Sequence, residues 1–281
     1  MAASHGRFVW YELMTTDMEA AKAFYAKVVG WGAQDVSMPG MPYTLFTVEG
    51  VSVGGLMGLP EDAKKIGERS SWIGYVGVDD VDAAAERIER LGGTVHVPPQ
   101  NMLDISRFAV VADPQLATLA LVQWLKPRRE QPAEPTAPGR IRWHELFAAD
   151  REKAFAFYRE VFGWQEANPE NHATGTYQQF SAGGETIGGF LTKPATVPVP
   201  FWLYYFNVGN IDAALTRVKA SGGQILEGPL EVSGDGWILQ CADPQGAMFA
   251  LVGTRSHKPI GYFERDAARD ASDPQSRRWS W

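Results

Sequence analysis

The chain has 281 residues, of which 45% are hydrophobic and 21% are charged, as in a soluble globular protein large enough for two domains. Its formal net charge is −7, and no stripe of Lys and Arg stands out, so we expect no nucleic-acid partner. No apolar run approaches the roughly 18 residues of a membrane span, so we expect no membrane partner. The N-terminal residues lack signal-peptide features, and the single cysteine, Cys241, cannot form an internal disulfide, which together favour the cytoplasm.

An internal repeat dominates the sequence. Residues 6–31 (GRFVWYELMTTDMEAAKAFYAKVVGW) align without a gap on 139–164 (GRIRWHELFAADREKAFAFYREVFGW), with 14 identities in 26 positions. Three later matches pair 42–60 with 176–194, 71–93 with 201–223, and 110–122 with 240–252. The period of about 130 residues is too long for a solenoid repeat and predicts two duplicated domains. We place them at 1–125 and 139–260, with a Pro-rich linker at 126–138 and a polar tail at 261–281.

The first part of each half has the same predicted elements. In the first half, residues 8–14 form a short apolar strand, and Thr16 or Asp17 then caps a helix. The helix has an apolar stripe with i, i+3, i+4, i+7 spacing and ends at Gly30; the stripe is Ala21, Phe24, Tyr25 and Val28. Two strand-like segments follow, at 43–49 and 51–57.

The pattern then starts again. Residues 72–78 form a strand, an apolar stripe from Val81 to Leu91 marks a helix, and further strands lie near 94–97, 107–112 and 117–124. The chain thus holds four βαβββ modules, two in each half. We predict an α+β fold in which these modules form two cupped mixed sheets, with the helices on the outer face.

Two repeated motifs carry a resemblance to a known superfamily. The first is Asp17-x-x-x-Ala21-x-x-Phe24-Tyr25 followed by Gly30-Trp31, which recurs from Asp150 to Trp164. The second is the Asp-Pro-Gln sequence at 113–115 and 243–245. With these motifs, residues 6–124 and 139–254 resemble the vicinal oxygen chelate proteins, which include glyoxalase I, extradiol dioxygenases and the fosfomycin and bleomycin resistance proteins. The resemblance is specific for the fold and weak for the reaction, because this fold hosts several chemistries and pure binders.

The resemblance also implies where a metal would bind. Metal-bearing relatives place His, Gln or Glu ligands on four strands of each cup. The matching residues here are Trp10, Gly55, Ile73 and Ala120 in the first half and Trp143, Gly189, Leu203 and Ala250 in the second. None of these side chains is a donor for a divalent metal, so we expect no metal and no other cofactor. His144 lies beside Trp143, but strand alternation turns it toward the helices, where we expect a structural role.

Aromatic side chains and one carboxylate per half are expected to line the cups instead. Strand alternation places Trp10, Glu12 and Met14 on the concave face of the first cup, and Trp143, Glu145 and Phe147 on that of the second. The later strands add Tyr75 and Tyr205. These residues are candidate ligand contacts, with Glu12 and Glu145 as candidate catalytic groups. The tryptophans could equally be core residues, and each carboxylate could instead pair with Arg7, Arg107 or Arg140.

Two functional hypotheses follow. In the first, the protein is a metal-free binder of a small aromatic or cationic molecule, like the bleomycin-resistance members. In the second, it is a lyase, isomerase or hydroxylase-like enzyme in which Glu12 or Glu145 acts as a general base. We also expect the two halves to pair as a pseudo-dimer, with each cup joining residues 6–60 to 201–254, or 71–124 to 139–194.

Overall fold

A computed structural model of the chain describes residues 4–36, 40, 42–65, 67–126, 137–167, 177–232 and 236–255. Most of the expected linker and the whole expected tail lie outside these residues, so the domain boundaries remain predictions. None of the helices in the described part of the chain has the length and hydropathy needed to cross a bilayer.

Strands and helices follow one order in both halves. The first half contains β1 (Phe8–Thr15), α1 (Met18–Val28), β2 (Gly32–Asp35), β3 (Tyr43–Val48), β4 (Val51–Gly58), α2 (Glu61–Lys65), β5 (Ser71–Gly77), α3 (Val81–Arg90), β6 (Thr94–Met102), β7 (Ser106–Ala112) and β8 (Thr118–Trp124). The second half contains β9 (Ile141–Ala148), α4 (Arg151–Phe162), β10 (Gln165–Ala167), β11 (Tyr177–Ala182), β12 (Glu185–Thr192), β13 (Phe201–Asn210), α5 (Ile211–Ala220), β14 (Gln224–Val232), β15 (Gly236–Ala242) and β16 (Met248–Thr254).

Each half folds into one mixed sheet, which confirms the predicted fold class. The strand orders are β2-β3-β4-β1-β5-β8-β7-β6 and β10-β11-β12-β9-β13-β16-β15-β14. Strand β1 runs parallel to β4 and antiparallel to β5, so it joins the two modules of its own half. The expectation that each cup joins modules of different halves is therefore wrong. Strand β1 pairs with β4 along one edge and with β5 along the other, so neither edge is left for a strand of the other half.

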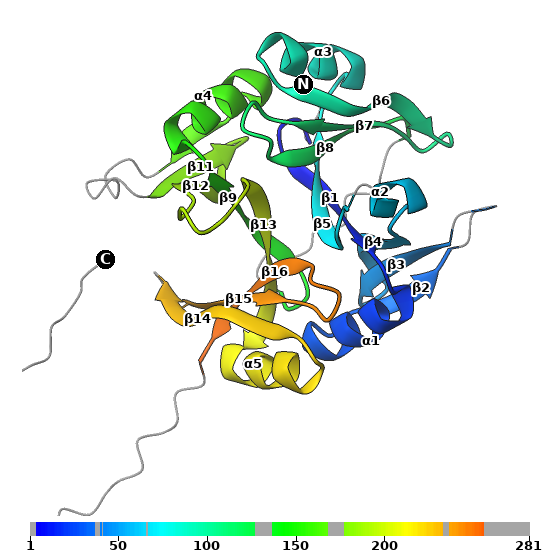
Figure 1. Cartoon of the computed structure of the whole chain (residues 1–281), viewed down its shortest axis with the longest axis vertical. Helices are drawn as coiled ribbons and strands as arrows, with labels where there is room; N and C mark the ends of the chain where they lie inside the picture. Colours follow the sequence, from blue (N-terminus) through cyan, green and yellow to red (C-terminus); the bar gives the residue numbers. More distant parts are fainter. Residues whose placement is uncertain are drawn as a thin grey trace, which may run out of the picture.

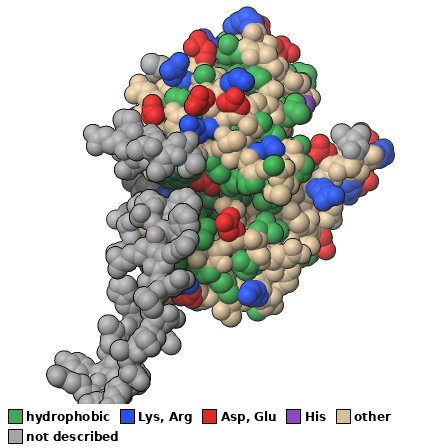
Figure 2. All heavy atoms as spheres, turned by 60° about the vertical axis from the view of Figure 1, so that its left-hand side comes forward, with side chains coloured by type: hydrophobic (Ala, Val, Ile, Leu, Met, Phe, Trp, Pro, Cys, Tyr) green, Lys and Arg blue, Asp and Glu red, His purple; other side chains and the backbone are tan. Residues whose placement is uncertain are grey.

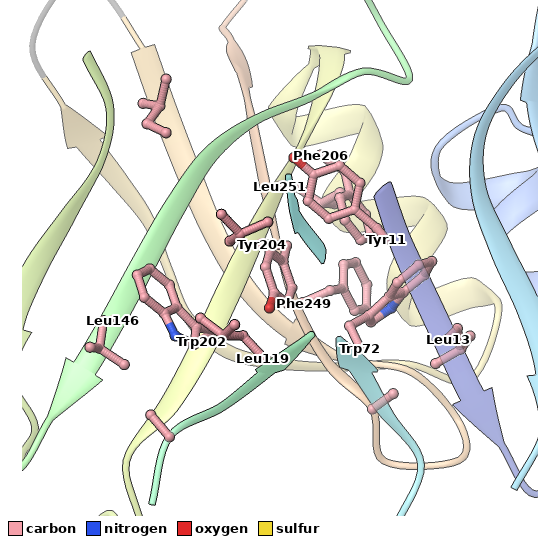
Figure 3. Close-up of a cluster of buried hydrophobic side chains, with 14 of the residues drawn as sticks. Tyr11, Leu13, Trp72, Leu119, Leu146, Trp202, Tyr204, Phe206, Phe249 and Leu251 are labelled. Atoms are coloured by element: carbon pink, nitrogen blue, oxygen red, sulfur yellow. The ribbon is translucent and has the colours of Figure 1, made fainter. Parts of the chain in front are cut away.

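The two halves meet through the faces that lie opposite the cups. Helix α1 contacts α5, and α3 contacts α4, so the helices flank the contact (Figure 1). Between them, side chains from the non-cup faces of both sheets form a shared aromatic and aliphatic cluster (Figure 3). Its members include Trp72, Trp202, Tyr204, Phe206 and Phe249. Burying such large apolar side chains is the main favourable term in joining the halves.

The two sequence motifs of the repeat meet across this interface. Tyr25 Oη donates to Asp243 Oδ2 at 3.1 Å, and Tyr158 Oη donates to Asp113 Oδ2 at 3.1 Å. The other oxygen of Asp113 accepts the backbone N–H groups of Gln115 and Ala117, which holds its own turn in shape. Each helical Tyr of one half is thus fixed to the Asp-Pro-Gln turn of the other, and the reciprocity gives a pseudo-twofold arrangement.

Two pairs of equivalent positions meet where the halves cross. Tyr11 and His144 occupy matching places in β1 and β9, and their side chains approach to 2.5 Å between Oη and Nε2. His144 Nδ1 lies 2.6 Å from the carbonyl oxygen of Ile187, so Nδ1 donates there and Nε2 accepts from Tyr11. Gly74 and Tyr204 also match, and the Gly74 N–H donates to Tyr204 Oη at 2.7 Å. His144 has the structural role that strand alternation predicts.

Burial lowers the pKa of His144 from 6.5 to about 4, which makes acid stability a test of this contact. The unfolded chain takes up the His144 proton at a higher pH than the folded chain does, so protonation favours unfolding. As the pH falls from 6.5 to about 4, this residue should cost about 3 kcal/mol of folding free energy. Urea unfolding at several pH values should show this loss in the native protein and not in His144→Gln. Equal acid sensitivity of the two proteins would contradict the assignment.

Candidate functional site

A cavity of about 530 Å³ lies in the first cup, on the face of β1 that carries Trp10 and Glu12. Its walls are mostly apolar and aromatic; they include Trp10, Leu45, Tyr75, Phe108, Val122 and Trp124. Within the described part of the chain, Glu12 is the one charged residue that lines this cavity. An apolar cavity of this size with a few polar groups is typical of a small-molecule site.

Two tyrosines hold the Glu12 carboxylate. Tyr43 Oη donates to Oε2 at 2.8 Å, and Tyr75 Oη donates to Oε1 at 3.2 Å. The Tyr43 hydroxyl in turn accepts a hydrogen bond from the indole of Trp10. Burial raises the pKa of Glu12, and the bonds from the two tyrosines lower it in part.

The expected alternative of an arginine partner for Glu12 is wrong. Arg7 forms its ion pair with Glu185 at 2.8 Å, and Arg107 pairs with Asp82 at 2.6 Å. Both arginines lie on the surface, where opposite charges are available without the cost of burying a guanidinium. On the face of the molecule shown in Figure 2, basic and acidic side chains are interspersed in the same way. Phenolic hydroxyls, rather than a cation, therefore stabilise the carboxylate.

The second half repeats this network. Tyr205 Oη donates to Glu145 Oε2 at 2.5 Å, and Trp143 Nε1 donates to the hydroxyl of Tyr177 at 2.8 Å. Tyr177 also bonds to Glu145, whose pKa is raised by burial. Sequence reasoning missed Tyr43 and Tyr177. The repeat contains their signal, because they occupy matching positions on cup-facing strands.

The surroundings of the two carboxylates differ. Glu12 is partly exposed within its cavity, whereas Glu145 is only 8% exposed. Phe147 stacks on Phe201 with ring centroids 4.8 Å apart, and it packs in a buried cluster that includes Tyr205. The residues that match this Phe pair in the first half are the smaller Met14 and Ser71, and neither lines the cavity.

Trp10 and Trp143 also differ in their surroundings. Trp10 lines the cavity, and Trp143 packs against the buried cluster of the second cup. Of the candidate ligand contacts, Trp10 and Tyr75 therefore lie together with Glu12 in the first cavity. Trp143, Tyr205 and Phe147 contribute to packing in the second half, and Met14 lies outside the first cavity's lining.

The positions that correspond to metal ligands do not fit a metal. Trp10 pairs with Tyr75 across β1 and β5, and Glu12 pairs with Gly55 across β1 and β4. A Cβ atom added at Gly55 would overlap the hydroxyl of Tyr43, and one at Gly189 would overlap that of Tyr177. The phenol fills the space into which a ligating side chain would extend. Among the described residues, no group of three or more His, Cys, Asp and Glu side chains could hold a metal.

Sequence comparison places the chain among known proteins. The model of the Glyoxalase/Bleomycin resistance protein/Dioxygenase superfamily matches residues 7–119 and 140–251. CFP32 of Mycobacterium tuberculosis, a glyoxylase by name, is 32% identical over 245 residues, covering 86% of this chain and 93% of that protein. DauV of a Streptomyces species, named as an anthracycline biosynthesis protein, is 30% identical over 266 residues, covering 90% of this chain and 95% of that protein.

Solved structures agree on the fold. The Mn(II)-bound glyoxalase from Novosphingobium aromaticivorans has a TM-score of 0.59 at 18% identity, covering 90% of this chain and 83% of that one. The 2,3-dioxygenase LapB from a Pseudomonas species has a TM-score of 0.60 at 14% identity, covering 93% of this chain and 97% of that one. At these identities the likeness concerns the fold alone.

Metal content gives a direct test of the site. Because the matched positions hold no donors, the purified protein should contain no stoichiometric Zn, Ni, Fe or Mn. Elemental analysis after extensive dialysis, without chelators, would measure this. A content near one metal ion per chain would contradict the expectation.

The contact between Gly55 and Tyr43 can be tested by mutation. Gly55→Ala should lower the free energy of unfolding by about 1–3 kcal/mol, because the new methyl group overlaps the Tyr43 ring and hydroxyl. In the double variant with Tyr43→Ala, the overlap is absent and the two losses should not add. Gly209→Ala is the control, since a Cβ there meets no atom within 4 Å. Additive losses in urea unfolding would show that the two positions do not interact.

Proposed function

Because the chain belongs to the glyoxalase/bleomycin resistance protein/dioxygenase superfamily but lacks metal donors at the matching positions, we propose that it is a metal-free binding protein for a small aromatic molecule, neutral or cationic. The ligand binds in the first cup. The observation that carries this proposal is the apolar cavity, in which Glu12 is the one charged lining residue within the described chain.

The walls of the cavity favour a flat ligand. Trp10, Phe108 and Trp124 offer aromatic surface, which stacks well on other rings and attracts cations to its faces. The carboxylate of Glu12 supplies the charge that a protonated amine would need when it leaves water. An anionic ligand is disfavoured, since its charge would face Glu12 and no Lys or Arg lines the cavity among the described residues.

The names of relatives point to the same class of ligand. The anthracycline biosynthesis proteins DauV and DnrV are each 30% identical to this chain over nine-tenths of its length. Anthracyclines are flat, fused aromatic compounds, many of which carry a protonated amino sugar. A molecule of this kind has both the rings and the cation that the first cup would recognise.

We assign the ligand to Glu12 and give Glu145 a role in packing. Each carboxylate has two tyrosine partners at matching positions of its own half, but Glu145 lies against a buried cluster and Glu12 lines a cavity. The chain therefore contains its own control: the Glu12 network binds the ligand, and the Glu145 network stabilises the second sheet. The enzymatic alternative rests on the same carboxylate, because burial raises the pKa of Glu12 and makes it a stronger base.

Glu12→Gln keeps the side-chain shape and removes the charge. It should weaken binding of an amino-sugar anthracycline by roughly 1–3 kcal/mol, the worth of a hydrogen bond to a charged group. Quenching of tryptophan fluorescence during titration would measure the affinity. The native affinity should also fall as the pH drops through the raised pKa of Glu12, since the neutral acid no longer attracts the cation.

Glu145→Gln is the matched control for this titration. It should lower thermal stability and leave affinity unchanged, because it disturbs a packed network away from the ligand. Equal loss of affinity in both variants would remove the assignment to the first cup. An unchanged affinity in Glu12→Gln would remove the role of the carboxylate.

A further inference from the structure

We propose that Ser106 and the hairpin tip beside it form a second recognition point in the first cup, which binds a ring carbonyl of the ligand at the end remote from Glu12. This inference rests on the proposed binding function and narrows its ligand class. The ligand is a molecule of several fused aromatic rings, with a protonated amine at one end and a ketone or quinone oxygen toward the other.

Ser106 faces the cavity from a strand that is not adjacent to the strand of Glu12. It pairs with Trp124 between β7 and β8, and Phe108 lies two residues further along β7. All three residues line the cavity. Because alternate side chains of a strand share one face of the sheet, the side chain of Ser106 points into the cup, as that of Phe108 does.

The hydroxyl of Ser106 is buried but has no hydrogen-bond partner among the described residues. The residue is only 6% exposed. A hydroxyl that has left water contributes to stability only when it finds a partner, and an unmet donor is tolerated less well than an unmet lone pair. A ligand oxygen with free lone pairs, such as a ring carbonyl, would accept this hydrogen bond.

The strand order sets the length of a ligand that reaches both groups. Glu12 lies on β1 and Ser106 lies on β7, with β5 and β8 between them (Figure 1). Neighbouring strands lie about 4.8 Å apart, so three such steps cover roughly 14 Å along the sheet, and less across a curved cup. A single six-membered ring is too short for this span, whereas a fused skeleton of several rings suits it. Tyr75 and Trp124 offer aromatic surface between the two points.

The hairpin between β6 and β7 extends the apolar wall beyond Ser106. Leu103 and Ile105 line the cavity, yet they are 59% and 50% exposed. Leu103 also has a φ of 51°, in the left-handed region that a residue with a Cβ atom disfavours. Apolar side chains at the mouth of an apolar cavity lose exposed area when a long ligand lies against them, which favours binding.

The repeat provides a comparison for these three positions. In the sequence of the second half the matching residues are polar or lack a side chain: Leu103, Ile105 and Ser106 correspond to Ser233, Asp235 and Gly236. The half whose carboxylate lines a cavity therefore has the apolar tip and the inward hydroxyl together. The half whose carboxylate lies against a packed cluster has neither at these positions.

Two probes of equal length and charge test the hydroxyl. They are 2-(aminomethyl)anthraquinone and 2-(aminomethyl)anthracene, which differ only in the ring carbonyls. In isothermal titration calorimetry, the full-length protein should bind the quinone about 3- to 10-fold more tightly, the worth of one net hydrogen bond. Ser106→Ala should reduce the affinity for the quinone by this factor and leave the affinity for the anthracene amine unchanged.

Ser52→Ala is the matched control, because Ser52 also lines the cavity but lies on β4, on the other side of Glu12 from Ser106. It should keep the native preference for the quinone. Leu103→Ser, which copies the residue of the second half, should weaken both three-ring amines roughly 3-fold or more, because apolar contact area is lost. It should leave the affinity for benzylamine, which has one ring, unchanged. Thermal melts would establish that each variant is folded.

The outcomes separate this inference from the binding function. If Glu12→Gln weakens the binding of the amines but Ser106→Ala keeps the native ratio of the two three-ring affinities, the role of Ser106 is overturned and the binding function stands. An equal loss for both three-ring amines in Ser106→Ala would mark a structural role and would also overturn the inference. Absence of saturable binding for every amine would overturn both proposals. Loss of the quinone preference in Ser106→Ala, and not in Ser52→Ala, would support the second recognition point.

Discussion

The hydrogen bonds between the helical tyrosines and the Asp-Pro-Gln turns fix how the two halves of this protein sit together. Tyr25 binds Asp243 and Tyr158 binds Asp113, so the first helix of each half is tied to the last turn of the other. These bonds hold the non-cup faces of the sheets against each other, around the aromatic cluster of Figure 3. Both cups are consequently turned away from the interface, and each is completed by strands of its own half.

A second constraint operates inside each cup. Gly55 and Gly189 provide room for the hydroxyls of Tyr43 and Tyr177, which reach the neighbouring carboxylates. In this way a hydrogen-bonded phenol and carboxylate occupy the region where related enzymes hold a metal. The matched positions themselves hold no His, Cys, Asp or Glu side chain, and the carboxylate in each cup is held by phenols.

Much of this arrangement could be predicted from the sequence. The repeat and the Asp17 cap predict the modules, and strand alternation predicts that Glu12 faces the cup. These features can be predicted because they depend on local periodicity. The prediction that each cup joins modules of different halves was wrong, because both modules of each sheet come from one half. This pairing depends on which edge of β1 the strand β5 reaches, and periodicity does not encode that. Tyr43 could not be found in this way, because it lies 31 residues from Glu12 in the chain. The two side chains meet only because Gly55, on the strand between them, leaves room for the Tyr43 hydroxyl. Glu12 lines a cavity, whereas Glu145 lies beside the cluster in which Phe147 packs. The two motifs are too similar in sequence to predict this difference in packing.

The contacts of Tyr11 with His144 and of Gly74 with Tyr204 have a consequence for the origin of the single chain. In a symmetric homodimer, a residue on the twofold axis can only meet its own copy. In a pair of second halves, two His144 side chains with Nδ1 donating to a carbonyl would present two acceptors to each other, and two Tyr204 rings would compete for the space that Gly74 leaves open here. Here a donor faces an acceptor and a large ring faces a glycine. Covalent fusion therefore permits complementary, unlike partners at the axis, which two copies of the second half could not provide for each other.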